Sequence, residues 1–306
     1  MDRVFANCQC QNHGPFCLVQ DTVGTMWNGS GTHCVFDIRY LLTHPEKFNN
    51  PDVLLLYWFM TLALRNDGHM TSRQTTGGFG LASKEAFAGS SAEYILNLLA
   101  SRNSKGDIVG RWATRAINIV PGGLHWEPGD ADYFVTTKDR TRFFARTDHL
   151  IVLLRIVVEA QGKTLEVFEA QEHTYACRLF TVWTRDVKIE GIKTKLSFVS
   201  APDCDSMAEV LDKFDISICK VMYDCRGTGM LTTRSDILRQ IKVGEATVKD
   251  FLVPYGSPDK FECNSIANTL HRMKKYGDRG YTFLNYPRFI RGVSRDELSK
   301  YVQKKT

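Results

Sequence analysis

The sequence predicts an α/β (α+β) fold in which a helical N-terminal part precedes a mixed β-sheet core. Two apolar segments near the start, at 52–64 and 90–102, have the length and the N-terminal punctuation of buried helices. From residue 111 onwards, short runs of β-branched and aromatic residues alternate with Gly, Asp and Pro, which is typical of strands. Helical patterns return between and after these strands, at 206–213, 233–241 and 265–276.

The short runs are interpreted as strands of one central sheet. They cover residues 117–120, 131–135, 150–158, 165–170, 176–183, 195–201 and 216–224. The run LIVLLRIVV at 150–158 is far shorter than the roughly 20 apolar residues that span a bilayer, so it is interpreted as a buried strand. We divide the chain into a Cys/His-rich and helical region at 1–110, an α/β domain at 111–290 and a basic tail at 291–306.

The composition is that of a globular protein with free thiols. Of 306 residues, 43% are hydrophobic, which is enough for a sizeable core, and the net charge of +5 permits an anionic partner without requiring one. The first ten residues, MDRVFANCQC, lack the apolar run of a signal peptide. Nine cysteines, spread along the chain, do not resemble a disulfide scaffold. We therefore expect an intracellular, cytoplasmic protein without a membrane segment.

A cluster of candidate zinc ligands lies near the N-terminus. Cys8, Cys10, His13 and Cys17 could supply four ligands, and a bound ion would give a fixed shape to a segment that lacks helical or strand periodicity. Their spacing, however, matches no common zinc finger. Unpaired thiols in a loop are the more frequent meaning of such a cluster, and both interpretations stay open.

An acidic pair gives the clearest functional signal. Asp130 and Asp132 precede the aromatic run YFV, and alternate residues of a strand point to the same face, so the two carboxylates lie side by side. Such neighbours repel unless both are solvated, one is protonated or a cation lies between them. Carboxylate oxygens at this spacing suit Mg²⁺ or Mn²⁺. A solvated turn at the start of a strand is the alternative.

Three further features accompany the pair. The glycines Gly122 and Gly123 follow a strand-like run and offer backbone N–H groups that could approach a phosphate. Asp215 lies at the start of another expected strand and would add a third carboxylate if the two strands were neighbours. The segment 265–281, with a helix expected at 265–276, carries a basic face with Arg272, Lys275 and Arg279, for which an ordinary solvated basic face is the alternative.

The order of these motifs resembles the nucleotidyltransferase fold of the DNA polymerase β superfamily. More narrowly, it is similar to divergent nucleotidyltransferase-like proteins common in viruses. In these, a Gly-Gly pair, an acidic pair before an aromatic residue, a Phe-Asp strand start and a Lys-Tyr-x-x-Arg-Gly-aromatic ending follow one another. The resemblance covers residues 117–281, a little over half of the chain. It implies a nucleotidyltransferase-like sheet as the core, and a setting in a host cell or virion.

The resemblance also implies a role for each matched residue and a reaction. Gly122 and Gly123 would form the phosphate-binding turn. The ligands of two Mg²⁺ or Mn²⁺ ions would be Asp130, Asp132 and Asp215, and the contacts to the triphosphate would be Lys274, Lys275 and Arg279. The reaction would transfer a nucleotide from an NTP to a hydroxyl on nucleic acid, a protein or a small molecule by two-metal catalysis.

The spacing between the glycines and the acidic pair departs from the family pattern. Only LHWEPG separates Gly123 from Asp130, whereas active members place most of a helix there, with its N-terminus facing the triphosphate. Pro128 and Gly129 also oppose a helix running into the pair. The alternative function is therefore a catalytically inactive protein on the same fold, viral or derived from a mobile element, which binds nucleic acid or other subunits.

Overall fold

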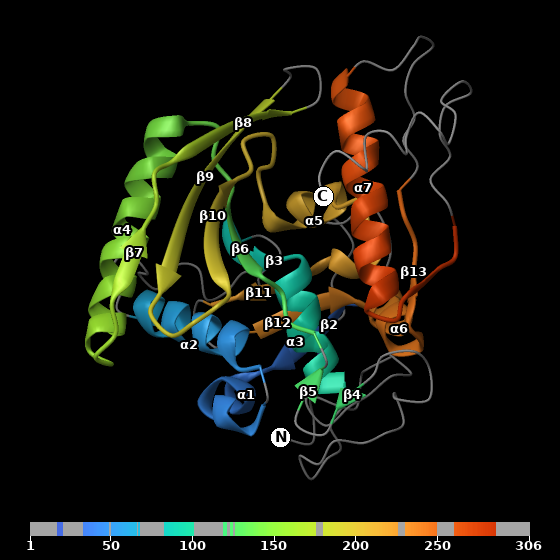
Figure 1. Ribbon diagram of the computed structural model, residues 1–306, viewed down its shortest axis with the longest axis horizontal. Coiled ribbons are helices and arrows are strands. Elements are labelled where there is room, and N and C mark those ends of the chain that lie inside the picture. Colours follow the sequence, from blue (N-terminus) through green and yellow to red (C-terminus); the bar gives the residue numbers. More distant parts are fainter. Residues whose placement is uncertain are drawn as a thin grey trace.

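The structure is a computed structural model of the 306-residue chain (Figure 1). It describes residues 17–20, 33–48, 50–65, 67, 83–100, 119–120, 123–124, 126–175, 180–225, 230–249 and 260–285. The expected basic tail at 291–306 and the candidate zinc ligands Cys8, Cys10 and His13 lie outside these residues. Cys17 begins a strand, but its side chain lies outside the described part.

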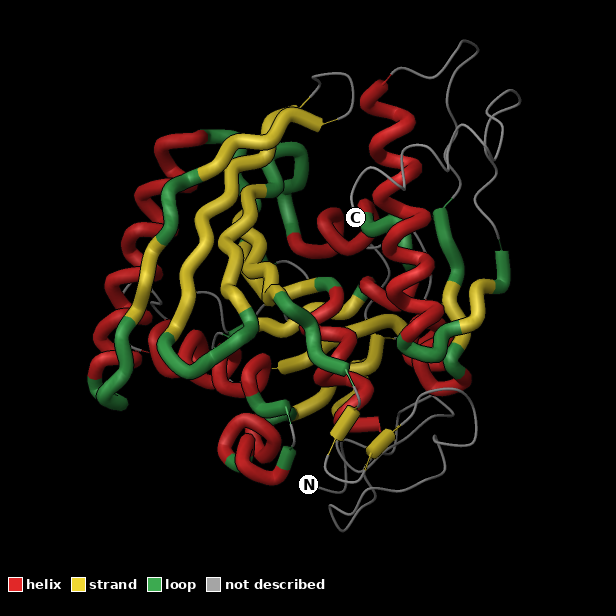
Figure 2. The backbone as a smooth tube through the Cα atoms, in the orientation of Figure 1, coloured by secondary structure: helices red, strands yellow, loops and turns green. Residues whose placement is uncertain are grey.

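A mixed β-sheet runs through the centre of the molecule (Figure 2). Its strands follow the order β1 (Cys17–Gln20), β2 (His33–Asp37), β12 (Met230–Arg234), β11 (Val221–Asp224), β3 (Glu85–Ala88), β6 (Asp130–Val135), β10 (Lys195–Ser200) and β9 (Phe180–Ile189), and β9 also pairs with β7 (Leu165–Val167) and β8 (Gln171–Tyr175). The β6–β10 pair is parallel, whereas the other described pairs in this sheet are antiparallel. The mixed sheet that the sequence predicts is confirmed.

Helices lie against this sheet, and most of them match the helical patterns in the sequence. They are α1 (Arg39–Thr43), α2 (Asp52–Arg65), α3 (Ser90–Ala100), α4 (Arg140–Glu159), α5 (Met207–Lys213), α6 (Ser235–Val243) and α7 (Lys260–Asp278), with 3₁₀ turns η1 (Pro45–Lys47) and η2 (Ser217–Cys219). Two small strand pairs lie apart from the central sheet, β4 (Ile119–Val120) with β5 (Gly123–Leu124) and β13 (Glu245–Ala246) with β14 (Thr282–Phe283).

The N-terminal part is helical, as predicted, but it also supplies three strands. The last of these, β3, lies between β11 and β6, so elements from both sides of the expected boundary near residue 110 form one sheet. Aromatic packing joins the two parts, because the ring of Tyr57 on α2 stacks on those of Phe87 on β3 and Tyr223 on β11. The ring centroids are 4.0 Å and 5.0 Å apart, respectively. All three side chains are fully buried.

The run at 150–158 is part of the twenty-residue helix α4, so its prediction as a strand is wrong. The carboxylate of Asp139 caps this helix by accepting a hydrogen bond from the backbone N–H of Arg142. Its buried residues follow helical spacing, with Phe143, Thr147, Leu150, Ile151, Leu154, Val157 and Val158 facing the core. Val152 and Ile156 are more than half exposed, so apolar residues also lie on the solvent side of the helix. The run therefore lacks a clear helical alternation and resembles a buried strand when the residues before it are ignored.

The two faces of the sheet have different neighbours. Along β6, Ala131, Tyr133 and Val135 pack into the core with α2, α3 and α4. The opposite face carries Phe134, which packs with residues of α5. Because side chains alternate, Asp130 and Asp132 lie on the α5 face. No described helix is both long enough and apolar enough to cross a membrane.

Candidate functional site

The acidic pair opens strand β6, as the sequence predicts. Asp130 is exposed and Asp132 is partly buried, while Ala131 between them is fully buried on the other face. Burial raises the pKa of Asp132 to about 7, and repulsion from Asp130 adds to this shift, which Lys195 and Lys275 oppose. At neutral pH the folded chain therefore holds a carboxylate whose ionised form would be stabilised by additional positive charge.

A third carboxylate lies on the same face, two strands away. Across the sheet, Asp132 is paired with Ser197 of β10, and Ser197 is paired with Asp186 of β9. Directly paired residues share a face, so the three side chains form one row. Lys195 lies opposite Asp130, and its Nζ donates a hydrogen bond to Asp186 Oδ2 at 2.5 Å.

The sequence carried a weak signal for Asp186. The expected strand at 176–183 stops short of it, whereas β9 continues to Ile189. Asp is depleted inside strands, so an Asp in the interior of TVWTRDVKI is unusual. Its relation to the acidic pair depends on the order β6–β10–β9, which no local pattern encodes.

A glycine turn that the sequence interpretation missed lies next to the acidic pair. Ala88, the last residue of β3, is paired with Asp132 of β6. The following residue, Gly89, has a φ of 85°, a region that favours glycine, and its carbonyl accepts the first hydrogen bond of α3 from Glu93 N at 3.0 Å. The N-terminus of α3 therefore begins beside the carboxylates.

This turn changes the meaning of the short LHWEPG spacer. Helix α3 begins at Ser90, directly after this turn, so a strand, a Gly-Ser-Ser turn and a helix precede the acidic strand in the chain. The signal was present in the sequence as EAFAGSSAEYILNLLA, a small apolar strand followed by glycine, a serine pair and an amphipathic helix. Gly123 instead lies in the β4–β5 hairpin, and Gly122 is outside the described residues.

Helix α7 contributes cations on the side of the acidic pair. Burial and then Arg279 lower the pKa of Lys275, while Asp130 and Asp132 raise it, so the ammonium lies within electrostatic range of both carboxylates. Lys274, the preceding residue, is exposed on the helix. Of the two predicted lysines, Lys275 is the one whose charge interacts with the acidic pair.

Arg279 is a buried cation one turn further along the chain. Its side chain is 6% exposed, and its guanidinium lies 3.8 Å from the ring centroid of Trp126. Its Nη1 atom has no hydrogen-bond partner within the described part of the chain. Burial raises the pKa of Glu93 on α3 to about 7, and Arg279 is the strongest opposing influence. The arginine thus links α7 to the first turn of α3.

Asp215 makes its contacts with α7. Its Oδ2 atom accepts hydrogen bonds from Thr269 Oγ1, from Arg272 Nε at 3.1 Å and from Arg272 Nη2. It lies in the segment before η2, not on a strand of the row that contains Asp132 and Asp186. Its carboxylate is therefore engaged by a cation of the protein itself.

The donors at the acidic pair suit a divalent ion that is shared with a substrate. Among the described residues, no three His, Cys, Asp or Glu side chains converge on a position that could hold a metal ion. Mg²⁺, however, is usually bound by one or two carboxylates together with substrate phosphates and water. Asp130 and Asp132 supply that number of ligands, and the raised pKa of Asp132 indicates that a cation there would relieve repulsion.

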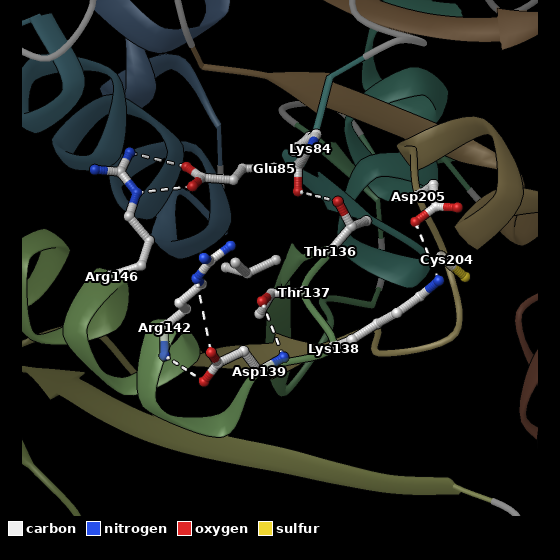
Figure 3. Close-up of a pocket in the computed structure, with 11 residues that line it drawn as sticks. Lys84, Glu85, Thr136, Thr137, Lys138, Asp139, Arg142, Arg146, Cys204 and Asp205 are labelled. Atoms are coloured by element: carbon white, nitrogen blue, oxygen red, sulfur yellow. Dashed lines mark hydrogen bonds and ion pairs between the residues drawn. The ribbon is translucent and has the colours of Figure 1, made fainter.

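A separate hollow of about 600 Å³ lies at the other end of β6 (Figure 3). Three of its cations have a carboxylate partner in the hollow, Arg146 with Glu85, Lys138 with Asp205 and Arg142 with Asp139, and Lys84 also lines it. The Arg146 guanidinium also binds Asp67, and the Tyr133 hydroxyl donates to Glu85. The ion pairs within this hollow satisfy its acidic groups.

Comparison with known proteins gives a distant structural similarity. Neither a protein-family model nor a curated protein matches the chain. Among solved structures, the chain is similar to the Thermotoga maritima CCA-adding enzyme complexed with tRNA, with 11% sequence identity and a TM-score of 0.41. The similarity covers 88% of this chain and 46% of that one, so the chain spans about half the length of that enzyme chain. The assignments below rest on the geometry of the site.

Proposed function

We propose that the chain is a divalent-metal-dependent nucleotidyltransferase that moves a nucleotide from an NTP to a hydroxyl acceptor. One observation carries the proposal: the pairing of Ala88 with Asp132 brings the Gly89 turn and the N-terminus of α3 to the acidic pair. A helix N-terminus favours phosphate, and a carboxylate pair favours a divalent ion. An NTP bound to a divalent ion satisfies both at once.

The triphosphate would bind at the start of α3. The first backbone N–H groups of a helix have no partner within it, and Gly89 has no Cβ to obstruct an approaching phosphate. Lys275 would add a charge-assisted contact from α7. Arg279 would act behind Lys275, because it is buried against Trp126.

Asp130 and Asp132 would hold the metal ions, with Asp186 in the third acidic position. We assign that position to Asp186 because it shares a row with Asp132, whereas Asp215 lies in the segment before η2. Each of these carboxylates binds a cation of the protein, Asp186 with Lys195 and Asp215 with Arg272. Bound divalent ions would offset the charge that develops on the transferred phosphoryl group and the leaving pyrophosphate. Asp186 would accept the proton of the acceptor hydroxyl once Lys195 releases it.

The bonds exchanged are those of an in-line displacement. The acceptor oxygen forms a bond to the α-phosphorus while the bond from that phosphorus to the bridging oxygen breaks, so pyrophosphate leaves. A nucleic-acid acceptor, and the viral setting that the sequence resemblance implies, belong to the same proposal.

One observation favours the rival function, a non-catalytic protein that binds nucleic acid or other subunits. The ammonium of Lys195 is bound to Asp186, so a cation of the protein occupies the third carboxylate. In a non-catalytic protein, this ion pair would stay closed, and the acidic pair would bind no metal.

The test is nucleotide transfer by the full chain. The protein is incubated with each α-³²P-labelled NTP and Mn²⁺ or Mg²⁺, with single-stranded RNA and DNA as acceptors, and with no acceptor to detect labelling of the protein itself. We expect Asp132→Asn and Asp186→Asn to abolish incorporation. Asp205→Asn is the matched control, because Asp205 is exposed in the other hollow. Equal incorporation by the wild type and Asp132→Asn would refute the assignment, and failure of the wild type with every acceptor would favour the rival function.

A further inference from the structure

A second hollow, of about 370 Å³, lies between the C-terminal end of α5 and the segment 247–249. It includes neither Asp130 nor Asp132. Two backbone hydrogen bonds fix its frame: Ser217 N donates to Thr247 O at 2.9 Å, and Lys249 N donates to Asp215 O at 2.7 Å. Its volume falls in the range of small-molecule sites.

Three cations converge on this hollow from different elements. Lys220 follows η2, Arg234 ends β12 and Lys249 lies in the 247–249 segment. Burial lowers the pKa of Lys220; Asp212 opposes this shift, and Lys249 and Arg234 add to it. Lys220 is therefore close enough to Lys249, which is exposed, and to Arg234, which is partly buried, for their positive charges to repel its own.

The Lys220 ammonium has little compensation from the protein. In the described part of the chain it makes one long hydrogen bond, 3.5 Å, to the carbonyl oxygen of Asp212. Its neighbours are better satisfied, since Arg234 makes two hydrogen bonds to Asp236 and the Asp215 carboxylate binds Arg272. These groups comprise four cations, Lys220, Arg234, Lys249 and Arg272, and three carboxylates, Asp212, Asp215 and Asp236. Among these seven described groups, positive charges outnumber negative charges by one.

In the hollow of Figure 3, by comparison, most of the cations are paired with carboxylates of the protein. There, Arg146, Arg142 and Lys138 each have a carboxylate partner within 4.0 Å. Lys220, by contrast, is partly buried and has a carbonyl as its hydrogen-bond partner. A partly buried ammonium beside two other cations costs free energy unless an anion joins them.

We propose that this hollow is a phosphate-binding subsite, with Lys220 and Lys249 as direct contacts and Arg234 as a fixed cation in its wall. The phosphate is carried by a free nucleotide or by a nucleic-acid strand. Helix α7 links the hollow to the acidic pair, because Arg272 holds Asp215 and Lys275, three residues later, interacts with Asp130 and Asp132. Residues 272 and 275 are separated by about 4.5 Å along a helix axis. Binding here requires no chemistry at the acidic pair.

The test is equilibrium binding to the full chain in EDTA, so that no metal bridges the ligand. Two probes separate the sources of phosphate: pyrophosphate, measured by calorimetry, and a fluorescent single-stranded 12-mer, measured by anisotropy. The test variant is Lys220→Gln/Lys249→Gln. Lys84→Gln/Lys138→Gln removes the same charge from the hollow in Figure 3 and is the matched control. Thermal unfolding confirms that each variant is folded.

We expect the test variant to bind at least one probe about tenfold more weakly, because it loses two charge-assisted contacts that contribute to the binding free energy. The control should bind less than about twofold more weakly. For the oligonucleotide, the slope of log K against log[salt] should become shallower by about 1.4, at about 0.7 per lost phosphate contact. Weakening of pyrophosphate alone identifies a free nucleotide as the ligand, and weakening of the oligonucleotide identifies a strand.

Equal weakening in both variants, or no saturable binding of either probe by the wild type, would overturn the proposal. If the wild type transfers no nucleotide but Asp130→Asn/Asp132→Asn still binds the probes, the proposed reaction is refuted and the phosphate subsite is supported. The two proposals can therefore fail separately.

Discussion

The two ends of the β3–β6 strand pair handle negative charge in opposite ways. At one end, Glu85 and the nearly inaccessible Asp67 share Arg146, which binds both with hydrogen bonds of 2.7 to 2.9 Å. At the other end, no ion pair joins Asp130 or Asp132 to another residue in the described part of the chain, and burial and repulsion from Asp130 raise the pKa of Asp132 to about 7. The first end is built for stability, whereas the second keeps a repulsion that a ligand can relieve.

The contrast explains why charge alone does not identify a site. Both ends of the pair are rich in acidic and basic groups, and the hollow at the compensated end is the larger of the two described above. Its groups nevertheless satisfy one another. Groups whose pKa is perturbed and whose charge the protein does not compensate are better candidates for ligand binding than groups that satisfy one another.

The largest expected effect is at the compensated end. Arg146→Ala leaves two carboxylates, Asp67 and Glu85, without their main partner in a partly buried place, and should lower the free energy of unfolding by about 2–4 kcal/mol. Arg140→Ala is the control, because Arg140 is exposed, makes a 3.9 Å ion pair with Glu172 and lies 5.5 Å from the ring centroid of Phe144, so its loss should cost less than about 1 kcal/mol. Urea denaturation measures both. Equal costs would mean that the network adds nothing to stability.

At the uncompensated end, removing a charge should raise the free energy of unfolding instead of lowering it. Because the folded-state pKa of Asp132 lies above its unfolded value, ionisation of this group lowers stability as the pH rises from about 4 to 7. Asp132→Asn removes this penalty. It should raise the free energy of unfolding by about 1–2 kcal/mol at pH 8 and change it little at pH 4. A metal-free Asp132→Asn protein that is less stable than the wild type at pH 8 would contradict this.

The Gly89 turn, beside Asp132 at the uncompensated end, is expected to give an effect no larger than that of Asp132→Asn. Gly89→Ala forces a Cβ onto a residue with a φ of 85°, which should cost about 1–2 kcal/mol. Space is not the limitation, because a Cβ there would lie 3.7 Å from Phe214. Gly162→Ala, with a φ of 69° in the turn after α4, is the matched control. Both should lower stability similarly, but Gly89→Ala alone should weaken NTP binding.

The smallest expected effect concerns Lys195, which faces the acidic pair. Lys195 lowers the pKa of Asp132, so Lys195→Gln should raise that pKa further above 7, by less than about one unit. Carboxyl ¹³C NMR titration measures the shift. Lys188→Gln, an exposed lysine on β9, should leave the pKa of Asp132 unchanged. If the pKa of Asp132 were unchanged in Lys195→Gln, Lys195 would not interact with the acidic pair.

The parts of the fold that the sequence predicted were those with a local signal. The acidic strand at 130–135 and the helices at 52–65, 90–100 and 207–213 show their periodicity within a few residues. The run at 150–158 was misinterpreted because two of its apolar residues, Val152 and Ile156, lie on the exposed side of α4, so the run alone shows no clear helical alternation. Helix α4 begins at Arg140, ten residues earlier, with Asp139 as its N-cap.

The candidate site was predictable only in part. Asp130 and Asp132 could be found because they share one strand, but Gly89 and Asp186 come from β3 and β9, distant in the chain. Strand order and register bring them together, and both are set by packing of the whole sheet. The glycine pair at 122–123 was predicted to bind phosphate because it lies near the acidic pair in the sequence. Gly89 is distant in the sequence, but the pairing of Ala88 with Asp132 places it next to the acidic pair in the sheet.

The central claim is that the uncompensated end binds a divalent ion together with an NTP. Mn²⁺ binding to the full chain, measured at pH 8 by the loss of the free Mn²⁺ signal in electron paramagnetic resonance with and without a non-hydrolysable NTP analogue, tests it directly. We expect the analogue to raise bound Mn²⁺ to about one or two equivalents in the wild type and in Asp205→Asn. In Asp130→Asn/Asp132→Asn, bound Mn²⁺ should exceed that of the protein-free analogue by less than about 0.2 equivalents. Equal Mn²⁺ binding by the wild type and Asp130→Asn/Asp132→Asn would contradict it.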